Sequence, residues 1–182
     1  MTEYRTLKEP QIRRELFSHF IRRQEVTGCW RKKDGVWQIQ DDPFIDDWSE
    51  ADYEELIRCL KHTCRAGGLV RGAWVRGQLK GFVSVEAEPL GSRGQYLDLS
   101  SLHVSLDARR LGIGRALFAA AAQWAFEKGA EKLYISAHSA VESQAFYRSM
   151  GCVEAEEYNP EHVQKEPFDC QMECALPLVS SH

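Results

Sequence analysis

Apolar and polar positions follow a helical period in the first third of the chain and a strand period in most of the rest. Over residues 10–23, apolar side chains recur at three- and four-residue spacing, which predicts an amphipathic helix. An Asp34-Gly35 turn and a capping box formed by Ser49 and Asp52 mark a hairpin and a second helix. The elements expected in this third are a strand, a helix, a hairpin, an acidic loop and a helix, over residues 4–7, 10–23, 30–40, 41–47 and 49–64.

From residue 69 onwards, runs of β-branched and aromatic residues alternate with turns that contain glycine or proline. Between two of these runs, a stripe of apolar residues at helical spacing predicts a long helix. The expected strands cover residues 69–75, 79–87, 95–105, 132–137, 152–156 and 168–176, and the expected helices cover 112–128 and 141–150. A meander followed by a β-α-β-α-β run predicts an α/β fold of the α+β kind, with a mixed, mostly antiparallel central sheet flanked by helices.

Composition and charge narrow the class of protein. The 182 residues show no internal repeat or linker, so we expect a single domain over 1–182. The 23 Lys and Arg against 27 Asp and Glu leave a net charge of −4, which argues against a nucleic-acid partner. The apolar stretch 116–126 is too short to cross a membrane, and the charged N-terminus argues against a secretory signal. The sequence therefore predicts a soluble, cytoplasmic protein.

Six cysteines are scattered along the chain without a C-x-x-C pair. In a cytoplasmic protein they are expected to be free thiols, mostly buried as small apolar side chains. A zinc site of Cys170, Cys174 and His162 matches no usual ligand spacing, so no metal is expected.

One segment has the pattern of an anion-binding loop. A predicted strand runs directly into a loop with two glycines and several arginines, and a helix begins at once. The first N–H groups of a helix lack internal partners and carry the positive end of its dipole, so this arrangement suits a phosphate or pyrophosphate. A dinucleotide fingerprint would require glycine or alanine where Leu117 stands, and a Walker loop is absent.

Two motifs resemble those of the GNAT N-acetyltransferases. The spacing Arg109-x-x-Gly112-x-Gly114 resembles the family's pyrophosphate-binding signature, and the Phe-Tyr-x-x-x-Gly pattern within 145–152 resembles the end of its helix after strand five. The resemblance covers residues 50–176 well and the first third loosely. It implies a GNAT fold, acetyl-CoA as acyl donor, and an acceptor-side third over about 1–68 joined to a cofactor-binding core over about 69–176.

The resemblance also implies roles for individual residues. The phenol of Tyr147 would protonate the leaving thiolate, and Asp98 would act as general base through a water molecule. Two histidines, His103 and His138, are rival candidates for the base, although His103 is better explained as a structural residue. The family often has Asn where Ala140 stands, so a neighbouring serine would replace that contact. The cofactor-binding residues implied are Leu102, Val104, Arg109, Arg110, Leu111, Gly112, Ile113, Gly114, Arg115 and Ser139, with Ser143 as the alternative to Ser139.

The acceptor is expected to be a small cationic amine, such as an aminoglycoside-like compound, a polyamine or an amino sugar. Carboxylates and aromatic faces attract cations, and the 41–48 segment contains both. The C-terminal segment 157–162, with Glu166 and Asp169, would form the opposite wall. A protein lysine or N-terminal acetyltransferase and a non-catalytic acyl-CoA sensor remain alternatives, and a homodimer is left open. The expected acceptor-side residues are Asp42, Phe44, Asp46 and Trp48.

Overall fold

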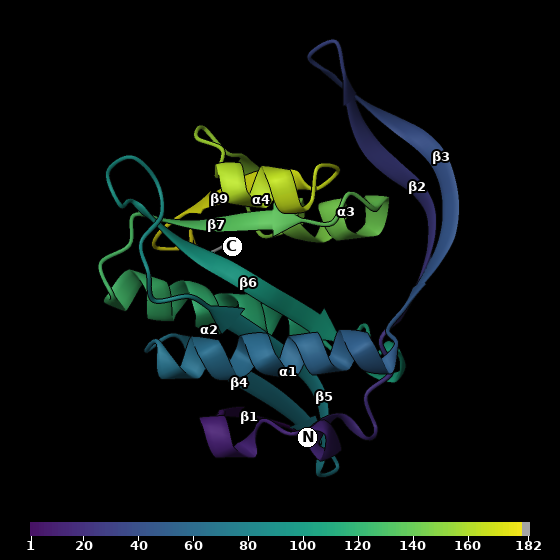
Figure 1. The fold of residues 1–182 in the computed structure, drawn as a ribbon, viewed down its shortest axis with the longest axis vertical. Helices are drawn as coiled ribbons and strands as arrows, with labels where there is room; N and C mark the ends of the chain where they lie inside the picture. Colours follow the sequence, from purple (N-terminus) through teal and green to yellow (C-terminus); the bar gives the residue numbers. More distant parts are fainter. Residues whose placement is uncertain (180–182) are drawn as a thin grey trace.

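A seven-stranded sheet with strand order β1-β4-β5-β6-β7-β9-β8 forms the centre of the computed structural model, which describes residues 1–179 (Figure 1). All pairs of neighbouring strands are antiparallel except β6 and β7. A separate two-stranded sheet contains β2 and β3. The strands are β1 (Thr2–Thr6), β2 (Arg23–Lys33), β3 (Val36–Asp47), β4 (Leu69–Val75), β5 (Gln78–Val85), β6 (Tyr96–Val104), β7 (Lys132–Ala137), β8 (Val153–Glu154) and β9 (Cys170–Ala175).

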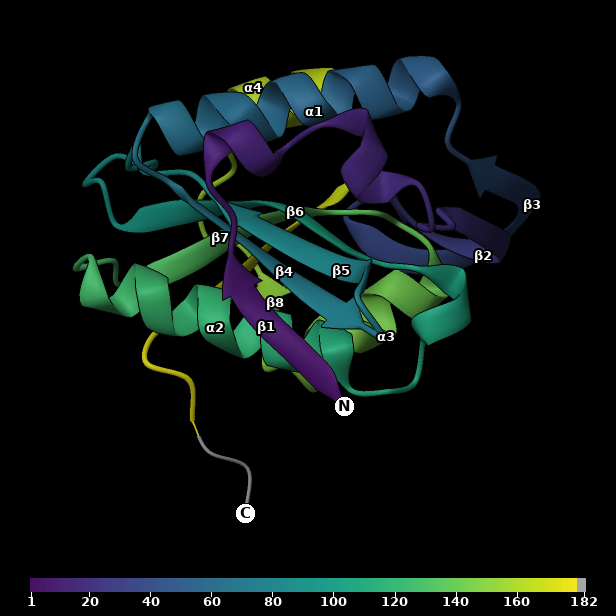
Figure 2. The same cartoon turned by 90° about the horizontal axis from the view of Figure 1, so that it is seen from below.

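Helices cover both faces of the large sheet. The helices are α1 (Glu50–Arg65), α2 (Ile113–Glu127), α3 (Val141–Ser149) and α4 (Pro160–Lys165). Figure 2 shows α1 and α4 on one face and α2 and α3 on the other. The expected α+β class, with a mostly antiparallel sheet flanked by helices, is confirmed.

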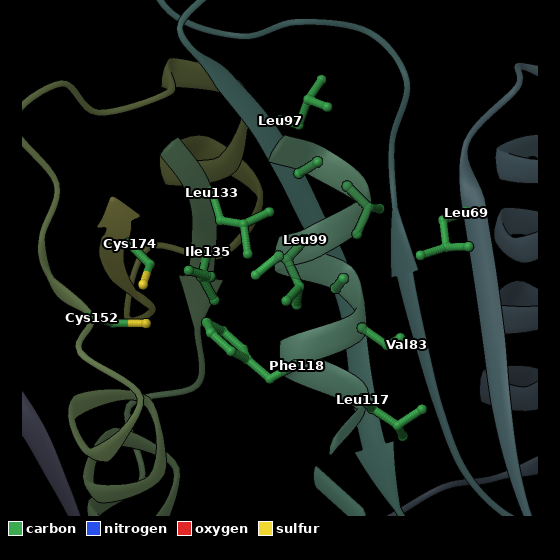
Figure 3. Packing of buried hydrophobic residues seen from close by; sticks show 14 of the residues in the cluster. Leu69, Val83, Leu97, Leu99, Leu117, Phe118, Leu133, Ile135, Cys152 and Cys174 are labelled. Atoms are coloured by element: carbon green, nitrogen blue, oxygen red, sulfur yellow. The ribbon is translucent and has the colours of Figure 1, made fainter. Parts of the chain in front are cut away.

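The main core lies between α2 and the sheet. The apolar stripe of α2 places Leu117 and Phe118, both fully buried, against Leu99, Leu133 and Ile135 from β6 and β7 (Figure 3). Burying large apolar side chains in this way stabilises the fold by roughly 1.5–3 kcal/mol each. This core holds β6, β7 and the start of α2 in a fixed relation, and these three elements surround the candidate site.

Several local predictions are confirmed. Strand β7 has the predicted bounds, and α2 begins one residue after the predicted position. The Ser49 capping box forms: the Asp52 N–H donates to Ser49 Oγ at 3.3 Å and the Ser49 N–H donates to Asp52 Oδ2 at 2.8 Å. The Asp34-Gly35 turn also forms, with both residues at positive φ (52° and 77°).

The predicted helix over 10–23 is wrong. The chain there forms two short 3₁₀ helices, Glu9–Gln11 and Arg14–Phe17, and β2 begins at Arg23. The apolar spacing is met by tertiary packing instead, because Phe17 and Phe20 both contact the ring of Phe82 on β5, at 5.5 and 5.4 Å between centroids. Propensity is a weak prior that such packing overrides.

The hairpin is longer than predicted. Residues 41–47, expected as an acidic loop, belong to β3, which pairs with β2 from Asp47 opposite Arg23 to Val36 opposite Lys33. Near its turn the hairpin is anchored on the connection between β7 and α3, where the Trp30 N–H donates to the Ser139 carbonyl at 2.8 Å. The helical first third is therefore mostly strand, apart from α1.

Helix α4 was not predicted from the sequence. It begins at Pro160, and the Asn159 side chain caps it by accepting the N–H of His162 at 3.0 Å. No helix of the described part of the chain is long and apolar enough to span a membrane.

All six cysteines are free thiols. Four of them are buried, as expected: Cys29, Cys152, Cys170 and Cys174. Within residues 1–179 no group of three or more His, Cys, Asp or Glu side chains is arranged to hold a metal ion.

Candidate active site

The candidate site is a cleft at the point where β6 and β7 separate. These strands pair only from Tyr96 to Asp98 with Lys132 to Tyr134, and they diverge beyond that point (Figure 1). A bulge inserts Ser100 into β6 relative to β5, and bulges bend a strand away from its neighbour. A cleft of about 580 Å³ opens there, with one wall along residues 98–104 of β6.

Two buried polar atoms of residues that line this cleft have no hydrogen-bond partner within the described residues. Within residues 1–179, three buried side-chain nitrogen or oxygen atoms lack a hydrogen-bond partner, and two of them, Arg22 Nη1 and Asp98 Oδ1, belong to residues that line the cleft. Buried polar atoms are almost always paired in folded proteins, because leaving one unpaired costs roughly 1–3 kcal/mol. A polar ligand or a water molecule in the cleft would satisfy both atoms.

On the α2 side, the backbone is arranged to bind an anion. Gly112 is the N-cap of α2 at φ 77°, and no side chain caps the helix, so its first N–H groups remain available. Gly114 lines the cleft together with Leu102 and Val104, whose edge of β6 faces away from β5 into the gap. These features fit a pyrophosphate group at the N-terminus of α2 and an extended chain, attached to that group, along the edge of β6.

The arginines around this loop differ in their surroundings. Arg109 lines the cleft and its Nη2 donates to the Arg23 carbonyl at 2.7 Å, which joins the loop to the start of β2. Arg110 adopts a positive φ of 68°, and its side chain and those of Leu111 and Arg115 are exposed. Ile113 is buried in the core instead.

Tyr147 lines the same cleft, from α3. Its ring packs against Phe118 and Phe146, at 6.3 and 5.2 Å between centroids. Burial raises the pKa of the Tyr147 phenol well above its ordinary value, so the group is protonated at physiological pH. The phenol therefore has a proton to donate, as a general acid requires.

Asp98 is paired with a histidine that sequence reasoning did not connect to it. The Asp98 side chain is buried, and its Oδ2 lies 2.7 Å from Nε2 of His162 on α4. The carboxylate raises the pKa of His162, against the opposing effect of burial. The imidazole also stacks on Tyr134 of β7, at 5.6 Å between centroids and 19° between planes.

The two rival histidines are neutral and already bonded. His103 Nδ1 accepts a hydrogen bond from Arg22 Nε at 3.2 Å, and burial lowers the pKa of His103 to about 3. His138 Nδ1 accepts the Ala140 N–H at 3.1 Å, and burial lowers the pKa of His138 as well. Both line the cleft, and the structural explanation expected for His103 agrees with these contacts.

The four expected acceptor residues do not line the cleft. Asp42 pairs with Arg31 at 3.4 Å and Asp46 pairs with Arg22 at 3.1 Å, so both carboxylates have a cationic partner. Trp48 packs on His103 and Phe44 on His138, at 4.7 and 6.0 Å between centroids. They lie behind the cleft wall, because β3 follows β2 rather than forming a loop over the opening.

The C-terminal segment contributes only part of the expected wall, because residues 157–161 do not line the cleft. His162, Lys165, Glu166 and Asp169 all line the cleft. Burial raises the pKa of Asp169 to about 6, and its Oδ2 accepts the Ser136 hydroxyl at 3.0 Å. The acidic groups that line the cleft thus come from β6, from α3 through Glu142, and from this segment.

Of the two candidate serines, only Ser143 lines the cleft. The Ser139 hydroxyl accepts a hydrogen bond from Arg31 Nη1 at 2.7 Å and is buried under the hairpin, whereas Ser143 lines the cleft. Arg22 and Gln24 also line it and were missed by the sequence analysis. Arg22 belonged to the predicted helix over 10–23 and Gln24 to no predicted element, and no local motif marks either residue.

Comparisons with known proteins agree with this geometry. The family model described as the acetyltransferase (GNAT) family matches residues 33–152. Among solved structures, nourseothricin acetyltransferase superposes with a TM-score of 0.72 at 18% identity, over 97% of this chain and 99% of that chain. A protein assigned as a streptothricin acetyltransferase from Bacillus anthracis str. Ames, in complex with acetyl coenzyme A, gives 0.67 at 17% identity, over 95% and 96%.

The PaiA N-acetyltransferase from Thermoplasma acidophilum, in complex with coenzyme A, gives a TM-score of 0.60 at 17% identity, over 96% of this chain and 99% of that chain. At these identities the solved structures share the fold alone. No curated protein has a significantly similar sequence. The family match covers most of the chain and includes the Gly-rich loop and Tyr147, and on this basis the chain belongs to the GNAT family of acetyltransferases, enzymes that use acetyl-CoA.

Proposed function

We propose that this enzyme transfers the acetyl group of acetyl-CoA directly to the primary amine of a small cationic compound. The observation that carries the proposal is the acidic character of the acceptor side of the cleft. Asp98, Glu166 and Asp169 line it together with Lys165, and over the whole cleft four carboxylates, Glu142 included, outnumber the three cations Arg22, Arg109 and Lys165. Carboxylates in a partly enclosed cleft attract an ammonium group and hold it near the reacting carbonyl.

The donor side supports direct transfer. Acetyl-CoA would lie with its pyrophosphate at the N-terminus of α2 and its pantetheine arm along Leu102 and Val104. In that arrangement Tyr147 supplies the proton that the leaving sulfur needs. A sensor that only binds acyl-CoA has no use for a protonated phenol at this position, so the catalytic function is favoured.

A small acceptor is favoured over a protein segment because the hairpin narrows access. The part of β2 near the turn bonds to the β7–α3 connection through Trp30, and the guanidinium of Arg31 lies over the ring of Phe168 at 4.5 Å. The hairpin thus contacts the segment between α4 and β9, which carries Glu166 and Asp169 of the cleft. Two structural neighbours are named nourseothricin acetyltransferase and streptothricin acetyltransferase, which agrees with a small-molecule acceptor.

The test is mass spectrometry of products after incubation with acetyl-CoA and a mixture of polyamines, aminoglycosides, amino acids and lysine peptides. An acetylated small cation supports the proposal. Acetylated peptide alone would favour the protein-modifying alternative, and bound acetyl-CoA without product from any acceptor would favour the sensor. The six free thiols would interfere with a colour assay for free CoA, so direct detection of product is preferable.

We propose the cytoplasm as the place of this reaction and a small-molecule amine as the partner. The free cysteines fit a reducing compartment.

A further inference from the structure

We propose that His162, held by Asp98, is the base that removes the proton from the acceptor amine, and that Asp98 is a positioning residue. The inference rests on the proposed function, because it concerns the acceptor of that reaction. It assigns a catalytic role to a histidine of the C-terminal segment, 64 residues away from its carboxylate partner in the sequence.

The pair lies where the cleft begins and on its acceptor side. Asp98 is the last residue of β6 that pairs with β7. Its neighbours Leu97 and Leu99 belong to the core under α2, and side chains alternate along a strand, so Asp98 points to the opposite face, which α1 and α4 cover (Figure 2). His162 of α4 meets it there at 2.7 Å.

The orientation of the ring is determined by its surroundings. The Asn159 side chain accepts the backbone N–H of His162, and the ring of Tyr134 stacks on the imidazole. The Tyr134 hydroxyl in turn accepts the Asn159 N–H at 2.9 Å, so the ring, its cap and its stacking partner form one connected unit. A base held in this way needs no reorganisation before it accepts a proton.

Hydrogen bonding distinguishes His162 from the other two histidines of the cleft. His103 and His138 each use Nδ1 as an acceptor for a protein N–H, so neither has a lone pair free on the ring. His162 donates Nε2–H to the Asp98 carboxylate, which leaves the lone pair on Nδ1. Among the hydrogen bonds of residues 1–179, Nδ1 of His162 has none.

The charges around the pair suit an ammonium group. Asp98 Oδ1 is buried and unpartnered within the described residues, and it needs a donor. The ionisable groups that act on His162 are Asp98 of β6, Lys165 of α4 and Asp169 before β9. Asp98 and Asp169 raise the pKa of His162, whereas Lys165 lowers it. The acceptor ammonium provides N–H donors for Oδ1 and a proton for Nδ1.

The step balances as follows. An N–H bond of the ammonium breaks and its proton moves to His162 Nδ1, which gives a neutral amine and an imidazolium beside Asp98. The amine nitrogen bonds to the acetyl carbonyl carbon, the carbon–sulfur bond breaks, and the sulfur takes the phenolic proton of Tyr147. The surplus proton on nitrogen restores the phenol, and the imidazolium releases its proton to solvent, so one proton is released for each acetyl group transferred.

The experiment compares wild type, His162→Asn and the control His62→Asn, which changes an exposed histidine of α1. For each, kcat/KM is measured against pH with the cationic amine that gives product in the screen, and with hydroxylamine after subtraction of the uncatalysed rate. Hydroxylamine is already unprotonated near neutral pH and needs no base. Thermal unfolding checks that each variant is folded.

His162→Asn is expected to lose about a hundredfold in kcat/KM with the cationic amine near neutral pH and to recover as the pH approaches the pKa of the amine. Its rate with hydroxylamine should stay within about threefold of wild type, and His62→Asn should match wild type throughout. An unchanged pH profile, or equal losses with both acceptors, overturns the inference while leaving the proposed function intact. A wild type that acetylates no amine overturns the proposed function and the inference with it.

A second variant, Asp98→Asn, keeps the shape of the side chain and removes its charge. NMR titration of ¹⁵N-labelled histidines should find the pKa of His162 lower in this variant than in wild type, with the pH profile of kcat/KM displaced in the same direction. A His162 pKa that does not move would show that Asp98 does not position the base.

Discussion

The two sides of the cleft are built in different ways. The donor side consists mainly of one stretch of sequence, from Leu102 of β6 to Gly114 at the start of α2, which includes Arg109, together with Tyr147 of α3. The acceptor side consists of ionisable side chains from β6, α4 and the 166–169 segment, far apart in sequence. A cofactor common to a family is recognised by a short local motif, whereas an acceptor particular to one enzyme is recognised by groups that only the fold brings together.

Loss of the proton donor is expected to have the largest effect. Tyr147→Phe should lower kcat by about a hundredfold, because the leaving sulfur loses the phenol that protonates it, while acetyl-CoA affinity stays within about twofold. Steady-state kinetics and calorimetry measure the two quantities. Tyr4→Phe, on the distant edge strand β1, is the matched control. A Tyr147→Phe enzyme that turns over like wild type would remove Tyr147 from the mechanism.

Gly114→Ala is expected to weaken the binding of acetyl-CoA while it increases the stability of the folded protein. A Cβ there would lie 3.4 Å from the Phe146 ring, an ordinary contact, so the folded protein accommodates it. Because alanine restricts the unfolded chain more than glycine, we expect a gain of about 0.5 kcal/mol in the free energy of unfolding. The methyl group would obstruct the approach to the α2 N-terminus and raise the Kd of acetyl-CoA about tenfold.

The control for this variant is Ala119→Gly, at an exposed position of the same helix. It should lower the free energy of unfolding by about 1 kcal/mol without changing the Kd. If Gly114→Ala leaves the Kd unchanged, the donor does not approach this part of the helix.

The pH dependence of KM tests whether the charge of Asp169 helps to bind the acceptor. Its pKa of about 6 means that the charge is lost as the pH falls through 6, so KM for a cationic amine should rise several-fold below that pH. Asp169→Asn should have the higher KM at all pH values. The folded state binds this proton more tightly than the unfolded chain, so ionisation of Asp169 costs stability as the pH rises from about 4 through 6. The variant should therefore have a higher Tm near pH 7 but not near pH 4.

The smallest effects are expected from the carboxylates of β3. Because Asp42 pairs with Arg31 at an exposed position, Asp42→Asn should change KM for the amine by less than about threefold, whereas Asp46→Asn leaves the buried Arg22 without its carboxylate and should act mainly by lowering stability. Acceptor kinetics of both variants beside Asp169→Asn measure which carboxylates the acceptor contacts. A larger effect at β3 than at Asp169 would move the acceptor site to the hairpin.

The sequence alone determined those parts of the molecule whose structure depends on residues close together in the chain. The Ser49 capping box and the Asp34-Gly35 turn form through contacts a few residues apart, and the apolar stripe of α2 follows from the spacing of its own residues; all three were predicted. The Gly-rich loop belongs to the same class, because a helix N-terminus binds an anion through its own backbone. The family could be predicted for this reason.

Tertiary structure alone decided the acceptor side. The apolar spacing over 10–23 is equally compatible with a helix and with irregular chain packed on β5, and contacts with Phe82 selected the second. The pairing of Arg22 with Asp46, and of Asp98 with His162 across 64 residues, has no local signature. The interaction between two charged groups depends on the distance between them in the folded protein. For residues far apart in the sequence, no pattern along the chain indicates that distance.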